Sequence, residues 1–303
     1  MMNNFVFCTI VTADYLPWAE TLNQSLNRFG SAKLVTLIVD QTEKPTKHLS
    51  SSIDLLNLED LKFEDWGNEL RDKYLQERDV LRWAMKPVLL KHLLTQYSKV
   101  IYCDCDIFFV NNYAFLFEEL DKSIALLTPH WRTRDPSIDK VEFTVSMWGG
   151  LYNAGFIGVN NKSGELLEWW GKACFFKCEK DRVNGFYDDQ KYLDLMPIHF
   201  NHVKVIRHQG CNVAAWNKDE CKRVAQDSEI RINGKDELIF IHFSGQTIGD
   251  IESGRDPLLK PYLDEFNKQL SAHGWVEKKQ PQVKSSKNLL LKLKSFISGK
   301  PRS

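Results

Sequence analysis

The sequence predicts an α/β protein built on a mixed, mostly parallel sheet flanked by helices. Two patterns carry this prediction. A β-rich run at 5–11 is followed by apolar residues at helical spacing over 17–29 and by a second buried run at 34–39, which is a strand, helix, strand unit. Further β-rich runs are found at 99–103, 107–110, 123–127, 154–159 and 238–243. Because ligands bind at the carboxyl ends of such strands, residues there are the first candidates for a site.

Helical spacing defines the rest of the predicted fold. Helices are expected at 83–97, 164–176, 188–195 and 257–272. The stretch 128–150 holds aromatic residues and glycines but has no clear period, so a long loop is expected there. Gly274 stops the last helix. We therefore predict one domain over residues 1–274 and a basic linker with an amphipathic tail over 275–303.

Charge and hydropathy exclude several classes of protein. Forty basic residues balance forty acidic ones, so no net field directs the chain to nucleic acid. The apolar runs fall short of the ~20 residues that span a bilayer, and the amino terminus lacks a signal-peptide pattern. A cytoplasmic protein is expected. Within the tail, the segment 287–298 predicts a basic amphipathic helix that contacts the inner face of the membrane, and a disordered basic tail is the alternative.

The cysteines indicate reduced thiols rather than disulfides or zinc. Their number is seven, which is odd, and Cys103 and Cys105 alternate with aspartates near a strand end. Cys174 and Cys178 have helical spacing but no second Cys or His pair nearby. Helix packing is therefore the preferred interpretation of that pair.

The most specific feature is the Asp104-Cys105-Asp106 tripeptide between apolar flanks. Alternate residues of a strand point the same way, so both carboxylates are expected to face one cavity. Burying two like charges is costly unless a cation compensates, and a hard divalent ion that bridges a diphosphate does so. A solvated turn is the alternative interpretation. The apolar flanks favour the metal site.

Four further segments, with this one, give the chain a resemblance to a known class of enzyme. In order they are WAMKPVLLKHLL, KVIYCDCDIFF, YNAGFIGVN, DDQKYLDL and IHFSG. Together they resemble the GT-A fold nucleotide-sugar glycosyltransferases, in particular glycosyltransferase family 8 and its bacterial relatives, over residues 5 to about 250. The resemblance implies a GT-A, Rossmann-like fold. It also implies metal-dependent transfer of a hexose from a UDP-sugar to a saccharide or lipid-linked acceptor in surface polysaccharide synthesis, with retention.

The same resemblance implies a metal site made of Asp104, Asp106 and His242. Mn²⁺ accepts an imidazole nitrogen beside carboxylate and phosphate oxygens, so this set favours Mn²⁺ over Mg²⁺. Without the resemblance, the preferred interpretation of His242 is a core histidine bonded to a carbonyl group.

The implied donor-binding residues come from several motifs: Thr12, Asp14, Tyr15, Lys86, Asp104, Asn153, Gly155 and Gly245. Tyr15 is expected to stack on the base. A side-chain amide at Asn153 suits sugar hydroxyls, and a glycine at Gly155 lets a sugar approach the backbone. The alternatives are a turn before the strand for these two residues and a solvated helical lysine for Lys86.

Asp189 and Gln190 are the implied catalytic residues, expected beneath the reacting sugar. Helix capping by these residues is the alternative. One departure stands out. A diphosphate-binding lysine usually follows the family's His-x-x-Gly element closely, whereas Gln246, Thr247 and Ile248 follow Gly245 here. Arg255 or Lys260 are the candidates to replace it.

The acceptor and the competing functions stay open at this point. The segment 212–217 and the loop 131–148 are candidates to line an acceptor pocket. A sugar-nucleotide nucleotidyltransferase of the same fold is one alternative, but no Gly-rich basic loop follows the first strand. A non-catalytic nucleotide-sugar binding module is the other, and the complete Asp104, Asp106 and His242 set argues against it.

Overall fold

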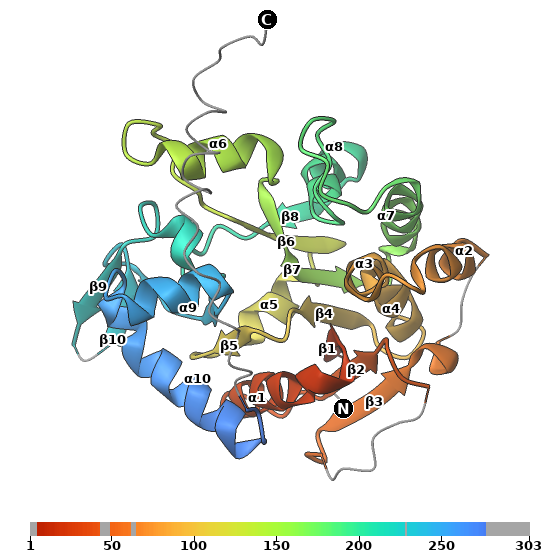
Figure 1. Cartoon of the computed structure of the whole chain (residues 1–303), viewed down its shortest axis with the longest axis horizontal. Coiled ribbons are helices and arrows are strands. Elements are labelled where there is room, and N and C mark those ends of the chain that lie inside the picture. Colours follow the sequence, from red (N-terminus) through yellow and green to blue (C-terminus); the bar gives the residue numbers. More distant parts are fainter. Residues whose placement is uncertain (1–4, 43–48, 62–64, 228, 277–303) are drawn as a thin grey trace, which may run out of the picture.

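The computed structural model describes residues 5–42, 49–61, 65–227 and 229–276. Its centre is a seven-stranded sheet in the order β3-β2-β1-β4-β7-β6-β8 (Figure 1). Only β7 runs antiparallel to its neighbours, β4 and β6. The predicted mixed, mostly parallel sheet is therefore confirmed. The strands are β1 (Phe5–Val11), β2 (Leu34–Ile38), β3 (Ile53–Asn57), β4 (Lys99–Cys103), β6 (Ala125–Pro129), β7 (Tyr152–Asn160) and β8 (Val203–Val205).

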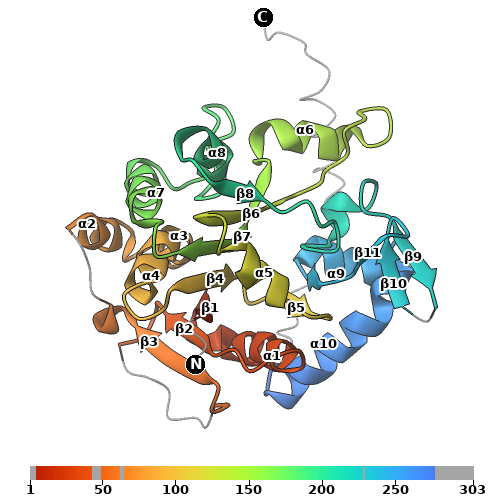
Figure 2. The ribbon, with the colours of Figure 1, turned by 180° about the vertical axis from the view of Figure 1, so that it is seen from behind.

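Helices cover both faces of this sheet, as Figures 1 and 2 show from opposite sides. Alternate residues of β1 point to opposite faces, so Val6 joins one buried cluster and Phe7 the other. The Val6 side is covered by α2 (Asp65–Tyr74), α3 (Arg78–Ala84), α4 (Lys86–Leu93) and α7 (Gly164–Phe176). The Phe7 side is covered by α1 (Leu16–Asn27) and α5 (Ala114–Glu119).

The carboxy-terminal part builds a second layer beside the main sheet. β5 (Ile107–Phe109) pairs antiparallel with β12 (Phe240–His242), and this pair forms a separate two-stranded sheet. A three-stranded sheet of β9 (Arg223–Gln226), β10 (Glu229–Ile232) and β11 (Asp236–Glu237) lies in the same region. The helices α9 (Gly245–Glu252) and α10 (Lys260–Ala272) complete it around a core that includes Phe108 and Phe266.

Two predicted segments differ from the structure. The expected helix 83–97 is divided into α3 and α4 at Met85, because Pro87 has no N–H to continue the ladder. The expected loop 128–150 contains α6 (Lys140–Trp148), whose first amides are capped by the Asp139 carboxylate. Glu142 is the one fully buried residue of α6, so its apolar side chains give no inward-facing pattern.

The predicted helix 188–195 is also displaced. A 3₁₀ helix over Lys191–Leu195 leads directly into the short α8 (Met196–His199). Its start at Lys191 leaves Asp189 outside the helix.

The described residues test the predictions for the cysteines and for membrane-spanning helices, but not the prediction for the tail. All seven cysteines are buried and unpaired. None of the described helices combines the length and apolar character that crossing a bilayer requires. Trp275, one residue after the predicted end of the domain at 274, packs against Tyr15 and Trp18. The predicted tail lies outside the described residues from position 277 onward, so the amphipathic segment 287–298 stays a prediction.

Candidate active site

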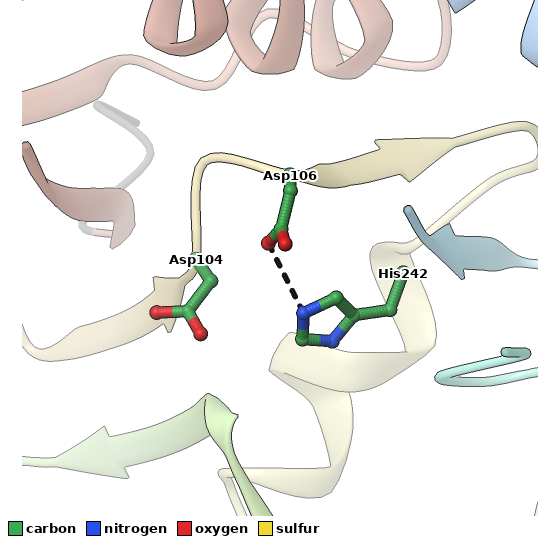
Figure 3. Close-up of side chains that lie close together, drawn as sticks. All are labelled: Asp104, Asp106 and His242. Atoms are coloured by element: carbon green, nitrogen blue, oxygen red, sulfur yellow. Dashed lines mark ion pairs between the residues drawn. The ribbon is translucent and has the colours of Figure 1, made fainter. Parts of the chain in front are cut away.

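Asp104, Asp106 and His242 converge where the two sheets meet (Figure 3). One potential ligand atom from each lies within 4.8 Å of the others. The sequence predicted that the aspartates alternate along a strand, and this prediction is wrong. They flank the turn between β4 and β5, in which the Ile107 amide donates to the Asp104 carbonyl at 3.1 Å. The turn brings both carboxylates to His242, at the end of β12.

His242 is oriented by a side-chain hydrogen bond on the side away from Asp106. Its Nδ1 lies 3.2 Å from Asn212 Oδ1, while Nε2 faces Asp106 Oδ1 at 3.0 Å. Asn212 is buried and adopts a left-handed backbone with φ of 63°. Nδ1 thus contacts a side-chain carbonyl group, and the role of His242 as a metal ligand stays a prediction. A second partner of this kind is what fixes the tautomer of a metal-binding histidine.

The electrostatics of the pair favour the charged carboxylate. Burial alone raises the pKa of a carboxyl group, but His242, a backbone hydrogen bond and Lys86 together hold the pKa of Asp106 below its ordinary value. Burial alone lowers the pKa of an imidazole, yet Asp106 raises the pKa of His242 above its ordinary value. A carboxylate and an imidazole nitrogen that already face one another are a donor set that suits Mn²⁺.

The space beside this cluster depends on Gly155 in β7. A Cβ atom at this position would lie 2.6 Å from Asn153 Oδ1, 2.6 Å from His242 Cε1 and 2.7 Å from Asp104 Oδ2. The missing side chain therefore leaves a small opening between three polar side chains. The neighbouring Asp104, Asp106 and His242 fit a divalent ion, because they offer carboxylate oxygens and an imidazole nitrogen within 4.8 Å of one another.

Lys86 is a buried cation at the centre of the site, with only 3% of its side chain exposed. Its Nζ donates to the Ala154 carbonyl at 3.0 Å and lies 3.1 Å from Asp189 Oδ2 and 3.7 Å from Asp104 Oδ1. Burial works against this charge, but the two carboxylates outweigh it and raise the pKa of Lys86. The solvated-lysine alternative is therefore wrong.

Asp189 is buried as well, and it does not cap a helix. The 3₁₀ helix that follows has no side-chain cap, and the Asp189 carbonyl accepts from Trp170 Nε1 at 2.9 Å. Burial raises the pKa of its carboxyl group to about 6, against the opposing effect of Lys86. Asp189 therefore takes up a proton more readily than a solvated aspartate, although Lys86, its ion-pair partner, stays charged.

Gln190 and Asn153 both fix the start of β7. The Gln190 side chain accepts from the Ala154 amide at 3.2 Å and donates to the Gly149 carbonyl at 2.6 Å. Asn153 Oδ1 accepts from the Gly155 amide at 2.8 Å, and its Nδ2 lies 3.2 Å from His130 Nε2. Asn153 lies within β7 rather than in a turn before it. The catalytic role of Gln190 and the sugar contact of Asn153 stay predictions.

A cavity of about 390 Å³ opens beside the two aspartates. Its wall joins Asp104, Cys105 and Asp106 to the aromatic residues Tyr15, Trp18 and Trp83, and also includes Arg82 and Gly245. Thr12 and Asp14 lie just behind this wall, where the Thr12 hydroxyl donates to Asp14 Oδ1 at 2.6 Å. Of the predicted donor-binding residues, Tyr15, Asp104 and Gly245 line this cavity, whereas Thr12, Asp14, Lys86, Asn153 and Gly155 are not part of its lining.

Sequence reasoning missed Arg82, which is the one cation among the residues that line this cavity. Its guanidinium group lies 5.9 Å from the centre of the Tyr15 ring, and its buried Nε has no hydrogen-bond partner among the described residues. No motif in the sequence contains Arg82. The proposed replacements for the missing lysine are engaged elsewhere, Arg255 with Asp250 and Lys260 with Asp264.

Comparisons with known proteins place the chain among proteins of similar length. It is 28% identical over 282 residues to the uncharacterized protein YfnF of Bacillus subtilis (strain 168), covering 88% of this chain and 91% of that protein. The uncharacterized protein YfnD of the same strain is 28% identical over 264 residues, covering 82% and 79%. No protein-family model matches the chain.

Two of the solved structures to which the chain is similar are glycosyltransferases. The galactosyltransferase LgtC, in complex with donor and acceptor sugar analogs, is 14% identical with a TM-score of 0.48, covering 90% of this chain and 97% of that one. Mouse xyloside xylosyltransferase 1 in its apo form is 13% identical with a TM-score of 0.47, covering 80% and 98%.

Proposed function

We propose that this protein is a metal-dependent glycosyltransferase of the GT-A type. It transfers a hexose from a UDP-sugar to a saccharide or lipid-linked acceptor, with retention of anomeric configuration. The observation that carries the proposal is the convergence of Asp104, Asp106 and His242 at the edge of a cavity with an aromatic wall.

The cavity has the features that a nucleoside diphosphate needs. Tyr15, Trp18 and Trp83 offer flat faces for a base, and Arg82 offers a guanidinium group for phosphate oxygens. Asp104, Asp106 and His242 would hold a divalent ion, which neutralises the charge that develops on a leaving diphosphate. Without a cation, the diphosphate and two carboxylates repel each other in a partly buried site.

On the sugar side of the site, we propose that the ionised Asp189 stabilises the positive charge of the sugar ring in the transition state. Lys86 holds this carboxylate in place at 3.1 Å. Gln190 fixes the backbone beside it through Ala154 and Gly149. In a retaining front-face reaction the leaving diphosphate accepts the acceptor proton, so no distant protein base is needed.

A double-displacement reaction is the second retaining route, in which Asp189 would form a covalent bond to the sugar. Proton NMR of the first product from an α-linked donor tests retention by either route, with an α-linkage as the expected result. A β-linked product contradicts retention and would require another residue to act as the base.

The donor and metal are tested by thermal shift with UDP, GDP and CMP, each with and without Mn²⁺. Ligand binding raises apparent stability by mass action, by about 2.7 kcal/mol at a hundredfold excess over Kd. The expected result is a shift for UDP that requires Mn²⁺ and is lost in Asp106→Asn. A nucleotidyltransferase would instead respond to UTP over UDP, and a shift that ignores Mn²⁺ would contradict the metal assignment.

A further inference from the structure

A second cavity, of about 220 Å³, is connected to the candidate metal cluster through Trp216, whose ring contacts both His130 in the cavity lining and His242. The ends of β6 and β8 and the turn after α6 surround it. Its lining includes His130, Trp131, Arg132, Tyr152 and Arg207, and none of its lining residues is acidic. This volume is below the ~300–1,000 Å³ of pockets for drug-sized ligands, so it suits a group about as large as one monosaccharide.

The charge of this cavity is positive because one of its two arginines has no acid beside it. Arg207 is exposed, its guanidinium group lies 5.9 Å from the centre of the Trp131 ring, and no described carboxylate lies at ion-pair distance from it. Arg132 pairs with Glu142, which does not line the cavity, and its buried Nε has no hydrogen-bond partner among residues that the structure describes.

The other titratable groups around the cavity do not cancel this charge. Asp194 faces Tyr152 from outside, where its carboxylate accepts from the Leu151 amide at 2.7 Å and pairs with Lys191 at 2.8 Å. Burial, with Arg132 beside it, holds the pKa of His130 well below its ordinary value, so its imidazole is neutral. Arg207 is therefore the charge available to a ligand.

The backbone of this cavity is held in an uncommon conformation. Trp131 has φ of 52°, which is rare for a bulky side chain and persists only where the surroundings enforce it. His130 next to it is fixed by contacts of 3.1 Å from Nδ1 to the Gly150 carbonyl and 3.2 Å from Nε2 to Asn153. The turn therefore directs His130 inward and places Trp131 under the Arg207 guanidinium.

Aromatic contacts join this cavity to the candidate active site. The Arg132 guanidinium group lies 5.9 Å from the centre of the Trp216 ring, and the centres of the Trp216 and His242 rings are 5.1 Å apart. One indole ring thus contacts both Arg132 of the cavity lining and His242 of the candidate metal cluster.

We propose that this cavity binds an anionic group, a carboxylate or a phosphate, carried by a saccharide acceptor. This proposal rests on the proposed transferase function, because only a transferase has an acceptor. Arg207 supplies the main charge, because a guanidinium group binds both anions with two parallel hydrogen bonds. Arg132 also lines the cavity.

The experiment measures sugar binding to the full chain by saturation-transfer NMR, without nucleotide or metal. The probes are sodium glucuronate, glucose 1-phosphate and glucose, at about 1–10 mM because single sugars bind weakly. Inorganic phosphate, which has no carbon-bound proton to observe, is added as a competitor. The two anionic sugars are expected to bind and glucose is not. Arg207→Ala should weaken their binding about 10-fold or more, as losing a hydrogen bond to a charged group does. Arg207→Lys should restore part of it.

Lys204→Ala is the matched control, because Lys204 is a cation in the adjacent strand β8 that pairs with Glu119 outside the cavity. This variant should bind both anionic sugars as the unaltered protein does. Three outcomes would each overturn the proposal. Glucose could bind as well as glucuronate, or Arg207→Ala could bind the anionic sugars as the unaltered protein does. Inorganic phosphate could also compete so well that the site shows no preference for the anionic sugars. UDP binding with Mn²⁺ is measured separately, so the proposed function can fail or hold independently.

Discussion

Lys86 Nζ lies 3.1 Å from Asp189 Oδ2, and 3% of each side chain is exposed. The same ammonium group lies 3.7 Å from Asp104 Oδ1. The Tyr102 hydroxyl donates a hydrogen bond to this oxygen. One buried cation therefore connects the candidate metal ligand Asp104 to the candidate catalytic carboxylate Asp189.

Replacing Lys86 by methionine should destabilise the fold at pH 7.5 by about 3–5 kcal/mol, because it leaves the buried Asp189 carboxylate without its cation. Urea denaturation measures the change. Lys172→Met is the control, since Lys172 forms an exposed helical pair with Glu168 that contributes only about 0.3–0.5 kcal/mol. Equal losses in the two variants would show that the buried pair has no special role.

The loss in Lys86→Met should shrink as the pH falls. The pKa of Asp189 is about 6 in the folded protein, above its unfolded value of about 3.9, and Lys86 holds it from rising further. A raised folded pKa gives stability that is present below the unfolded pKa and is lost as the pH rises through the folded one. Denaturation of the variant at pH 5 and 7.5 should therefore show a smaller deficit at pH 5. A deficit that does not change with pH contradicts this account.

Chelation should abolish transfer, and added Mn²⁺ should restore it. Asp106→Asn keeps the shape of the side chain but removes its charge, and we expect a loss of at least ~100-fold in rate. Steady-state rates at saturating donor measure this. Asp121→Asn, an exposed aspartate paired with Lys99, should keep full activity. Undiminished turnover in excess chelator would exclude the metal site.

Gly155→Ala should disable the metal site without changing any ligand. The new methyl group would lie under 3 Å from His242 and Asp104, so at least one of them must move. The thermal shift caused by UDP and Mn²⁺ should disappear. Gly249→Ala on α9 is the control, because a Cβ there meets nothing within 4 Å. A full shift in Gly155→Ala would mean that the site lies elsewhere.

Arg82→Ala should weaken binding of UDP about 10-fold or more and leave binding of uridine unchanged, because only UDP offers phosphate oxygens to the guanidinium group. Calorimetric titration in Mn²⁺ measures both. Arg255→Ala should behave as the unaltered chain, since Arg255 is paired with Asp250. Equal weakening of UDP and uridine would assign Arg82 to the base instead.

The sheet and much of the site could be predicted because their signals are local. Continuous β-rich runs predicted the strands of the large sheet except β3 and β8, and the order of the motifs brought Asp104, Asp106 and His242 together. The aspartates nevertheless lie in a turn rather than along one strand, because β4 ends at Cys103 and β5 pairs with β12 in a second sheet. Strand pairing of this kind depends on contacts far apart in the sequence.

The misses have physical causes of the same kind. Helix α6 presents Val141 and Met147 to solvent and buries Glu142, so its hydrophobic pattern does not point to a core. Lys86 looks like a surface lysine in sequence, because the two carboxylates that justify its burial follow 18 and 103 positions later. Arg82 and Arg207 stand in no motif, and only the shape of the folded cavities draws attention to them.

The two-stranded sheet has a consequence for the stability of the carboxy-terminal layer. Asp104 follows the end of β4 in the large sheet, whereas His242 belongs to β12, whose described backbone hydrogen bonds go to β5, Gly210 and Val213. An ion held by both residues would cross-link two separately hydrogen-bonded sheets. Filling the site should therefore slow amide exchange in residues 107–109 and 240–242, and chelation should speed it up again.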